Sequence, residues 1–310
     1  MPFLSFAQNL EDVVLRRALK DIAVGFYIDV GACSPDQDSV TRSLYDSGWS
    51  GINIEPNPEY YSQLVDKRDR DINLQIAAGQ ESDRLELNIF SGTGLSTLNK
   101  KVARKHSEAD YIDHMDSVSV DVLPLSEVWN LHVAENQDVH FLKVDVEGFE
   151  AEVLKGLDWK KNRPWIILVE ATKPMVQEFN YSEWEFYLIE NDYVFVYEDG
   201  LNRFYVSKEK IELSETFRFP PCVFDNYVLA SYDAEAKRAR KALQNLDNCK
   251  TQSQENLKKI CLLENEKRHL ILETQKLRDE LTSIQQSRIW KMTTPLRFVL
   301  GKVIAKYSRS

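Results

Sequence analysis

The sequence has no run of about 20 apolar residues, the length that a helix needs to cross a bilayer. Its first thirty residues carry Glu11, Asp12 and Asp21 among the hydrophobic positions, a mixture that is not typical of a signal peptide. The cysteines form no Cys-x-x-Cys pair, so neither a zinc site nor a disulfide framework is indicated. We therefore expect a cytoplasmic protein whose cysteines are reduced thiols.

Positive charge is also in deficit, because 39 Lys and Arg residues face 49 Asp and Glu residues, for a net charge of −10. This balance argues against nucleic-acid binding. The charge is unevenly spread, since Glu280 is the last acidic residue and only basic residues follow it. They are Arg288, Lys291, Arg297, Lys302, Lys306 and Arg309. We expect this segment to have a partner that the rest of the chain does not share.

Apolar residues make up 43% of the 310 residues, enough for a buried core. From Phe26 to Ser207, β-rich runs alternate with amphipathic helical stretches, which predicts an α/β domain with a mainly parallel sheet. The expected strands are residues 26–31, 51–56, 72–78, 140–148, 165–171, 193–198 and 203–207. The expected crossover helices are residues 39–47, 58–67, 147–157 and 183–191. Residues 85–90 alternate as an antiparallel strand does, and the polar stretch 92–117 is a candidate substrate loop.

Residues 233–287 contain neither glycine nor proline, and apolar residues recur there every seven positions. The repeating set is Leu263, Leu270, Leu277 and Ile284, with Ile260 and Leu281 at the alternate positions. This spacing favours a coiled coil, which we expect to be dimeric, although Lys267 and Thr274 interrupt its seam. The alternative is a single solvated helix packed on the α/β domain.

Residues 288–310 place apolar side chains among the basic ones. They are Trp290, Leu296, Phe298, Val299, Leu300, Val303 and Ile304. On a helix these residues form an apolar face rimmed by Lys and Arg, which is typical of segments that lie on a membrane surface. Contact with a partner protein needs the same residues. Pro295 is expected to break or start the helix.

Two strand ends carry the pattern of a nucleotide site. Residues 27–32, Tyr-Ile-Asp-Val-Gly-Ala, run from a strand into a glycine turn, and such crevices at the carboxyl ends of strands bind nucleotides. Glu55 ends the next strand, 26 residues after Asp29, and a carboxylate there can accept both ribose hydroxyls of an adenosine. Asp29 and Glu55 together therefore indicate adenosine binding.

Charged residues also interrupt an apolar strand at residues 141–148. Lys143, Asp145 and Glu147 alternate onto one side of it, and burying them is costly unless they are paired or functional. Glu147 is a candidate general base, and Asp145 can hold the ammonium group of a cofactor or form a structural pair with Lys143. Glu170 closes the next strand, so we expect these three carboxylates to cluster. Such a cluster can also hold Mg²⁺, but the spacing does not decide whether it does.

A nicotinamide oxidoreductase is an alternative for such a domain. The chain lacks both Gly-x-Gly-x-x-Gly and Tyr-x-x-x-Lys, which speaks against it. A non-catalytic scaffold is a third alternative, and the retention of Asp29, Glu55, Asp145 and Glu147 speaks against that one.

Several motifs in order resemble those of the FkbM-type methyltransferases, which are class I S-adenosylmethionine-dependent O-methyltransferases. The resemblance covers residues 5–227 and rests on residues 6–12, 27–32, 51–58, 95–97, 142–148, 153–156 and 199–205. It implies a Rossmann-like, seven-stranded, mainly parallel sheet that binds S-adenosyl-L-methionine, followed here by the coiled-coil helix. The cofactor residues that it implies are Gln8, Asp12, Asp29, Gly31, Ala32, Glu55, Pro56, Asn57, Ala77, Ala78 and Asp145. The methyl acceptor is then expected to face Glu147 and Glu170, with Asp145 beside them.

The tail has a resemblance of its own. A coiled coil followed by residues 287–297 is similar to the ends of bacterial enzymes that build cell-surface polysaccharides. This implies a glycan or nucleotide-sugar acceptor and a site at the cytoplasmic face of the inner membrane. The expected organisation is a methyltransferase domain over residues 1–232, a coiled coil over 233–287 that makes a homo-oligomer, and a basic amphipathic tail over 288–310.

Overall fold

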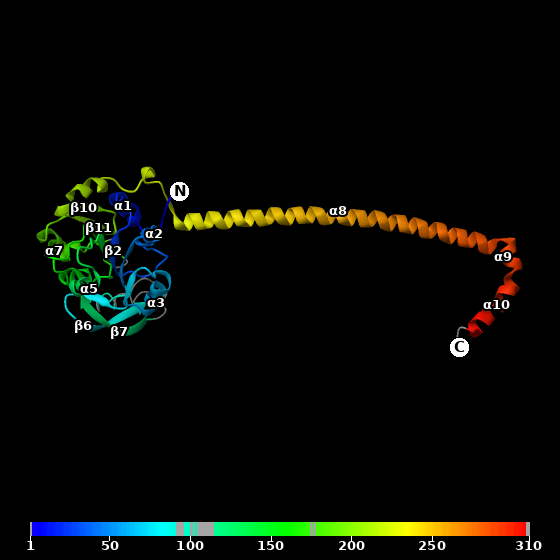
Figure 1. Cartoon of the computed structure of the whole chain (residues 1–310), viewed down its shortest axis with the longest axis horizontal. Helices are drawn as coiled ribbons and strands as arrows, with labels where there is room; N and C mark the ends of the chain where they lie inside the picture. The colour runs from blue at the N-terminus through cyan, green and yellow to red at the C-terminus, as the bar shows by residue number, and fades with distance from the viewer. Residues whose placement is uncertain are drawn as a thin grey trace. The chain divides into compact units, whose positions relative to one another are not determined.

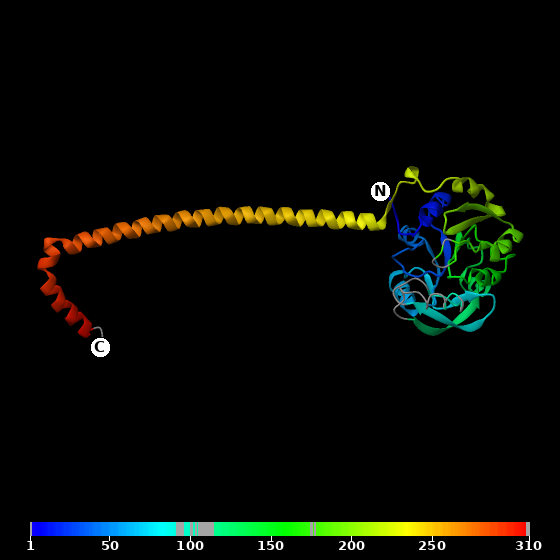
Figure 2. The same cartoon turned by 180° about the vertical axis from the view of Figure 1, so that it is seen from behind.

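The computed structural model describes residues 2–90, 96–99, 102, 104, 115–173, 176 and 178–307. The chain forms two compact units, Met1–Ala234 and Glu235–Ser310, and each is described here by itself. Figure 1 shows the chain from one side and Figure 2 from behind.

The first unit is built on a seven-stranded sheet in the order β10-β11-β9-β8-β2-β3-β4. The strands are β2 (Phe26–Val30), β3 (Ser50–Ile54), β4 (Ile72–Leu74), β8 (Phe141–Val144), β9 (Ile166–Glu170), β10 (Tyr193–Glu198) and β11 (Asn202–Ser207). From β4 to β9 neighbouring strands are parallel, and β10 and β11 are antiparallel. A mainly parallel α/β sheet followed by a C-terminal helix was predicted, and this is confirmed.

Helices connect these strands. They are α1 (Glu11–Ala18), α2 (Arg42–Asp46), α3 (Pro58–Lys67), α5 (Leu125–His132), α6 (Glu150–Lys155) and α7 (Glu185–Glu190), with 3-10 helices η1 (Tyr181–Glu183), η2 (Lys208–Phe217) and η3 (Val223–Asp225). Helix α3 begins sharply, because the Asn57 side chain accepts the Glu59 amide and Pro58 occupies the first turn.

The core lies on both faces of the sheet. In β9, Ile167 and Val169 pack into one apolar cluster, whereas Ile166 and Leu168 pack into the other. Successive residues of a strand point to opposite faces, so an apolar run such as 165–169 is needed where both faces are covered.

Two smaller sheets complete this unit. One contains β5 (Ala77–Gly79), β7 (Met115–Pro124) and β6 (Asp83–Phe90), and the other pairs β1 (Phe3–Ser5) with β12 (Tyr227–Leu229). The expected antiparallel strand at 85–90 is confirmed as part of β6, which pairs with β7 along the ribbon seen at the lower edge of both views. Much of the candidate substrate loop, residues 92–117, lies outside the described residues, and its last residues belong to β7.

Several boundary predictions were wrong. The strand expected at 140–148 covers only 141–144, so Asp145 and Glu147 lie beyond its end. Residues 72–78 form no single strand, because β4 ends at Leu74 and β5 starts at Ala77 in a different sheet. The helix expected at 39–47 covers only 42–46. The helix expected at 147–157 begins at Glu150, because Glu147 and Gly148 have positive φ angles of 53° and 89°, outside the right-handed helical region.

The second unit consists of helix alone. Helix α8 (Ala230–Gln286) begins in the first unit and crosses the expected boundary at residue 232, and α9 (Arg288–Met292) and α10 (Thr294–Tyr307) follow it. Pro295 lies in the first turn of α10, consistent with its expected role as a helix start. Among the described helices, none has both the length and the apolar composition needed to cross a membrane.

Candidate active site

The parallel strands align four polar or glycine positions in one row. Val30, Ile54, Val144 and Val169 are register partners across β3, β2, β8 and β9. The residues one step further are Gly31, Glu55, Asp145 and Glu170. They therefore meet at the carboxyl edge of the sheet. The strand order reverses here, because β3 and β4 lie on one side of β2 whereas β8 and β9 lie on the other.

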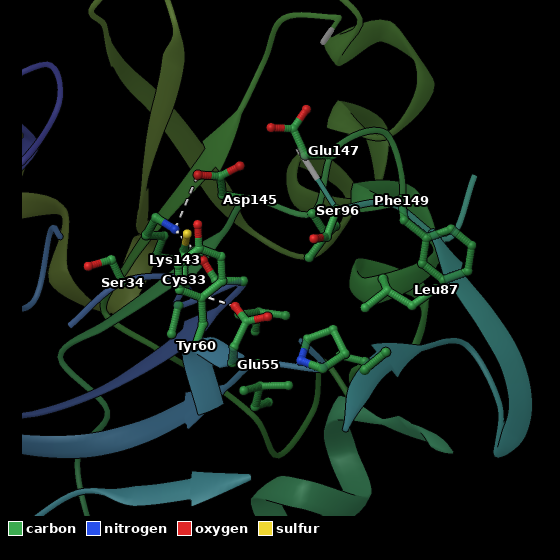
Figure 3. A pocket seen from close by; sticks show the side chains of 18 of the residues that line it. Cys33, Ser34, Glu55, Tyr60, Leu87, Ser96, Lys143, Asp145, Glu147 and Phe149 are labelled. Atoms are coloured by element: carbon green, nitrogen blue, oxygen red, sulfur yellow. Dashed lines mark hydrogen bonds and ion pairs between the residues drawn. The ribbon is translucent and has the colours of Figure 1, made fainter. Parts of the chain in front are cut away.

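A cavity of about 470 Å³ opens at this edge, a volume suited to a small organic ligand. It is lined by most of the residues predicted to hold a cofactor. They are Gln8, Gly31, Ala32, Glu55, Pro56, Ala77, Ala78 and Asp145, with Glu147 beside them. Figure 3 shows Glu55 and Tyr60 at one side of this cavity and Asp145 and Glu147 at another.

Glu55 is held in a fixed position by backbone amides. One carboxylate oxygen accepts the Cys33 amide at 2.7 Å and the other accepts the Asn57 amide at 2.8 Å. Burial raises the pKa of Glu55 to about 7, and the two amides act in the opposite direction by favouring the charged form. Each oxygen has a second lone pair, so the side chain can still accept ligand hydroxyls.

Gly31 permits the closest approach between β2 and the segment after β8. Its φ is +78°, and a Cβ atom built on it falls 1.8 Å from the Asp145 carbonyl oxygen. No side chain fits there, so the position requires glycine. Gly31 also lines the cavity.

Lys143 carries the positive charge of this edge. Its ammonium lies 3.3 Å from Asp29 Oδ1 and 3.2 Å from Asp145 Oδ2, and it donates to the Gly31 carbonyl oxygen at 3.0 Å. Burial alone lowers the pKa of Lys143, but Asp145 and Asp29 outweigh it, so the net shift is upward. Asp29 itself is buried beside β8 and is not among the residues lining the cavity.

Glu147 is positioned by a left-handed turn and not by strand alternation, because β8 ends at Val144. Thr97 donates to the Glu147 carbonyl oxygen at 2.8 Å, and Asn99 donates to that of Gly148 at 3.0 Å. Glu150 accepts the Gly148 amide at 2.9 Å. These bonds fix the turn that carries Glu147, which lines the cavity on the same side as Asp145.

The three predicted carboxylates do cluster. One oxygen each of Asp145, Glu147 and Glu170 lies within 4.8 Å of the others. Burial, followed by the charge of Asp145, raises the pKa of Glu147 to about 8 and that of Glu170 well above its usual range. Glu170 is 8% exposed and lies beside the cavity lining, not in it.

The motif at residues 6–12 is mainly structural in this arrangement. Gln8 lines the cavity, whereas Asp12 is buried and accepts Ser5 Oγ at 2.7 Å and the Phe6 amide at 2.9 Å. Asn202 donates to Glu11 at 2.8 Å and so ties this motif to β11. Asp12, Asp29 and Asn57 are thus predicted cofactor residues outside the cavity lining, and each supports a residue or turn near it.

Several lining residues were missed by the sequence analysis. They include Ser34, Gln37, Asp38, Tyr60, Gln63, Leu87, Ser96, Leu98 and Phe149. Tyr60 and Gln63 are three residues apart on α3, so the Asn57-Pro58 helix start was a usable signal for them. Leu87 comes from β6 in another sheet, and no local pattern indicates its place.

The family comparison agrees with the position of this site. A model described as the methyltransferase FkbM domain matches residues 29–195, more than half of the chain. That stretch contains Gly31, Glu55, Asp145, Glu147 and Glu170. No curated protein matches the chain.

Proposed function

Since the chain belongs to the FkbM methyltransferase family, we propose that it is an S-adenosylmethionine-dependent O-methyltransferase with a class I, Rossmann-like fold. The observation that carries the proposal is the row of Gly31, Glu55 and Asp145 along one cavity, at the edge where doubly wound sheets bind nucleotides. The strand order around β2 supports the fold assignment.

The lining residues fit the cofactor group by group. Glu55 accepts the ribose hydroxyls, because its carboxylate is already held by two amides and retains free lone pairs. The backbone of Gly31 and Ala32 contacts the amino-acid part, and Asp145 attracts its ammonium group. Pro56, Ala77, Ala78 and Leu87 supply the apolar surface for the adenine ring.

In the methyl transfer the protein has two roles, which are to remove a proton from the acceptor and to align it with the methyl group. Bound S-adenosylmethionine supplies a methyl group that is already activated by the sulfonium charge. Glu147 holds the acceptor hydroxyl and takes up its proton on a carboxylate oxygen. The cavity walls align the acceptor with the methyl group, which is the main catalytic demand of such a displacement.

We propose a sugar hydroxyl as the acceptor, carried by a glycan or a nucleotide sugar of cell-surface polysaccharide synthesis. The support is the likeness of the coiled coil and residues 287–297 to the ends of enzymes that build such polymers. On this proposal α8 forms a homo-oligomeric coiled coil, and α9 and α10 lie at the cytoplasmic face of the inner membrane.

Calorimetric titration of the full-length protein tests the cofactor. S-adenosylhomocysteine should bind with micromolar affinity, whereas NAD should not bind. Glu55→Gln should weaken S-adenosylhomocysteine binding by about tenfold, since one hydrogen bond to a charged group contributes roughly 1.5–3 kcal/mol. Glu86→Gln on the exposed edge of β6 is the matched control and should bind as the wild type does.

Each contrary result has a defined meaning. NAD binding would support the oxidoreductase alternative. Absence of binding by either ligand would support the scaffold alternative. A Glu55→Gln protein with unchanged affinity would place the ribose elsewhere.

A further inference from the structure

The acidic cluster beside the cavity has more carboxyl groups than the nearby ammonium can balance once they are ionised. Lys143 is the basic residue next to it, and its ammonium contacts Asp29, Asp145 and the Gly31 carbonyl oxygen. An ammonium has three donors, so these contacts occupy it fully. Among the described residues, no basic side chain forms an ion pair with Glu147 or Glu170.

Two buried oxygens in the cluster also have no hydrogen-bond partner among the described residues. They are Oε2 of Glu147 and Oε2 of Glu170. Glu170 is more than nine-tenths buried, and a buried carboxylate oxygen without a partner is costly. The neighbouring acid Glu150 shows the contrast, because it accepts the Gly148 amide at 2.9 Å. The cluster therefore has both the charge and the free lone pairs for a positively charged ligand.

We propose that Asp145, Glu147 and Glu170 together bind one hard divalent cation of the Mg²⁺ or Mn²⁺ type. The donors are carboxylate oxygens only, which these cations prefer over nitrogen and sulfur ligands. The three oxygens lie within 4.8 Å of one another, whereas neighbouring ligands at about 2.1 Å from Mg²⁺ are about 3.0 Å apart and opposite ligands about 4.2 Å apart. Cation binding therefore requires the three carboxylates to move closer together.

This cation would bind the methyl acceptor, an inference that rests on the proposed methyltransferase function. Asp145 and Glu147 line the cavity, so a cation that they hold is accessible from it. Three protein ligands leave positions of an octahedral shell for water or for acceptor oxygens. Neighbouring hydroxyls of a sugar can occupy two such positions, which would orient one of them for methyl transfer.

Manganese binding to the full-length protein tests the site without requiring activity. After dialysis against a chelator, the protein is titrated with Mn²⁺, and free Mn²⁺ is followed by its electron paramagnetic resonance signal. We expect one bound Mn²⁺ per chain, displaced by Mg²⁺. Glu170→Gln and Glu147→Gln should each weaken Mn²⁺ binding by at least about tenfold, the loss that removal of even an outer-shell partner can cause.

The cofactor site supplies the matched control. Glu55→Gln removes an equally buried carboxylate on the other side of the cavity, so it should keep Mn²⁺ binding and lose S-adenosylhomocysteine affinity. Glu170→Gln should show the opposite pattern, because Glu170 is not part of the cavity lining. Using two Glu→Gln variants of the cluster guards against one that does not fold.

The outcomes separate the cation site from the proposed function. Mn²⁺ binding without S-adenosylhomocysteine binding would support the cation site and contradict the methyltransferase proposal. Absence of stoichiometric Mn²⁺ binding, or wild-type affinity in both cluster variants, would overturn the cation site and indicate that protons alone neutralise the cluster. Binding of both ligands, with the two variant patterns above, is the expected result.

Discussion

Lys143, which lines the candidate active-site cavity, has its Nζ 3.3 Å from Oδ1 of Asp29 behind that lining, and the two side chains are 8% and 2% exposed. Separating the two groups is unfavourable, because each would then be a buried charge without a partner. The same ammonium holds Asp145, so the pair connects the stability of the sheet to the geometry of the site.

Replacing Lys143 should be strongly destabilising. Lys143→Met leaves two buried or half-buried carboxyl groups uncompensated, a type of change that costs about 3–5 kcal/mol. Urea unfolding of the two proteins measures the difference. Lys161→Met, which breaks an exposed pair with Asp158, should leave the unfolding free energy nearly unchanged. An equal effect of the two substitutions would show that the buried pair has no special role.

The pH dependence should report Glu147. In the metal-free protein, burial raises its pKa from 4.5 to about 8, so a Glu147 base is protonated near neutral pH, and kcat/KM measured without divalent cation should rise about tenfold per pH unit below that value. The native state binds a proton that the unfolded state has lost, so this group's contribution to stability is fully present below about pH 4.5 and is lost as pH rises toward 8.

Two measurements check this assignment. A pH series of kcat/KM should show the rise in the wild type, and a pH series of unfolding free energy should decline less in Glu147→Gln than in the wild type. A kcat/KM profile that is flat from pH 6 to 8 would contradict Glu147 as the base.

Gly31 should tolerate no side chain, whereas Gly48 should. Both have positive φ, but a Cβ at Gly31 meets the Asp145 carbonyl oxygen at 1.8 Å and a Cβ at Gly48 meets nothing within 4 Å. Gly48→Ala should therefore cost only the backbone strain of about 1–2 kcal/mol and keep S-adenosylhomocysteine binding. Gly31→Ala should cost more in thermal unfolding and lose binding in calorimetry. Retained binding would mean that the turn after β2 does not contact the cofactor.

The seam of α8 should determine the oligomeric state. Leu270 and Leu277 are seven residues apart and 61% and 60% exposed in the single chain. Leu270→Glu combined with Leu277→Glu places like charges in a coiled-coil seam, so sedimentation velocity should show a dimer converted to monomer. Leu272→Glu lies two residues off the seam and should remain dimeric. A monomeric wild type would exclude the coiled coil.

Helix α10 should bind anionic lipid through one face. Leu296 and Leu300 are four residues apart and therefore share a face, and both are exposed. Leu296→Glu with Leu300→Glu should abolish sedimentation with phosphatidylglycerol vesicles, because charged side chains then replace part of the apolar face. Equal binding to neutral vesicles would argue against the role of the basic residues.

Local patterns were sufficient for the row of site residues. Gly31, Glu55 and Asp145 each follow an apolar strand directly, Glu170 is the last residue of one, and parallel strands bring such positions to one edge. The heptads of α8 likewise predicted a long helix, because their period is a property of the sequence alone. In both cases the predicting pattern is local, because it involves only the residues of the element itself and of its neighbours in the sequence.

The tertiary structure decided what depends on distant partners. Asp29 was expected in the cofactor site, but its pairing with Lys143, far along the chain, places it beneath the cavity lining. Glu11 meets Asn202, and Glu147 takes a left-handed conformation fixed by bonds from Thr97 and Asn99 to its own turn. The sequence by itself determined which side chains reach the edge of the sheet, since strand direction and period suffice for that. Which of them line the cavity, and which lack a partner, depended on contacts between residues that only the folded chain brings together.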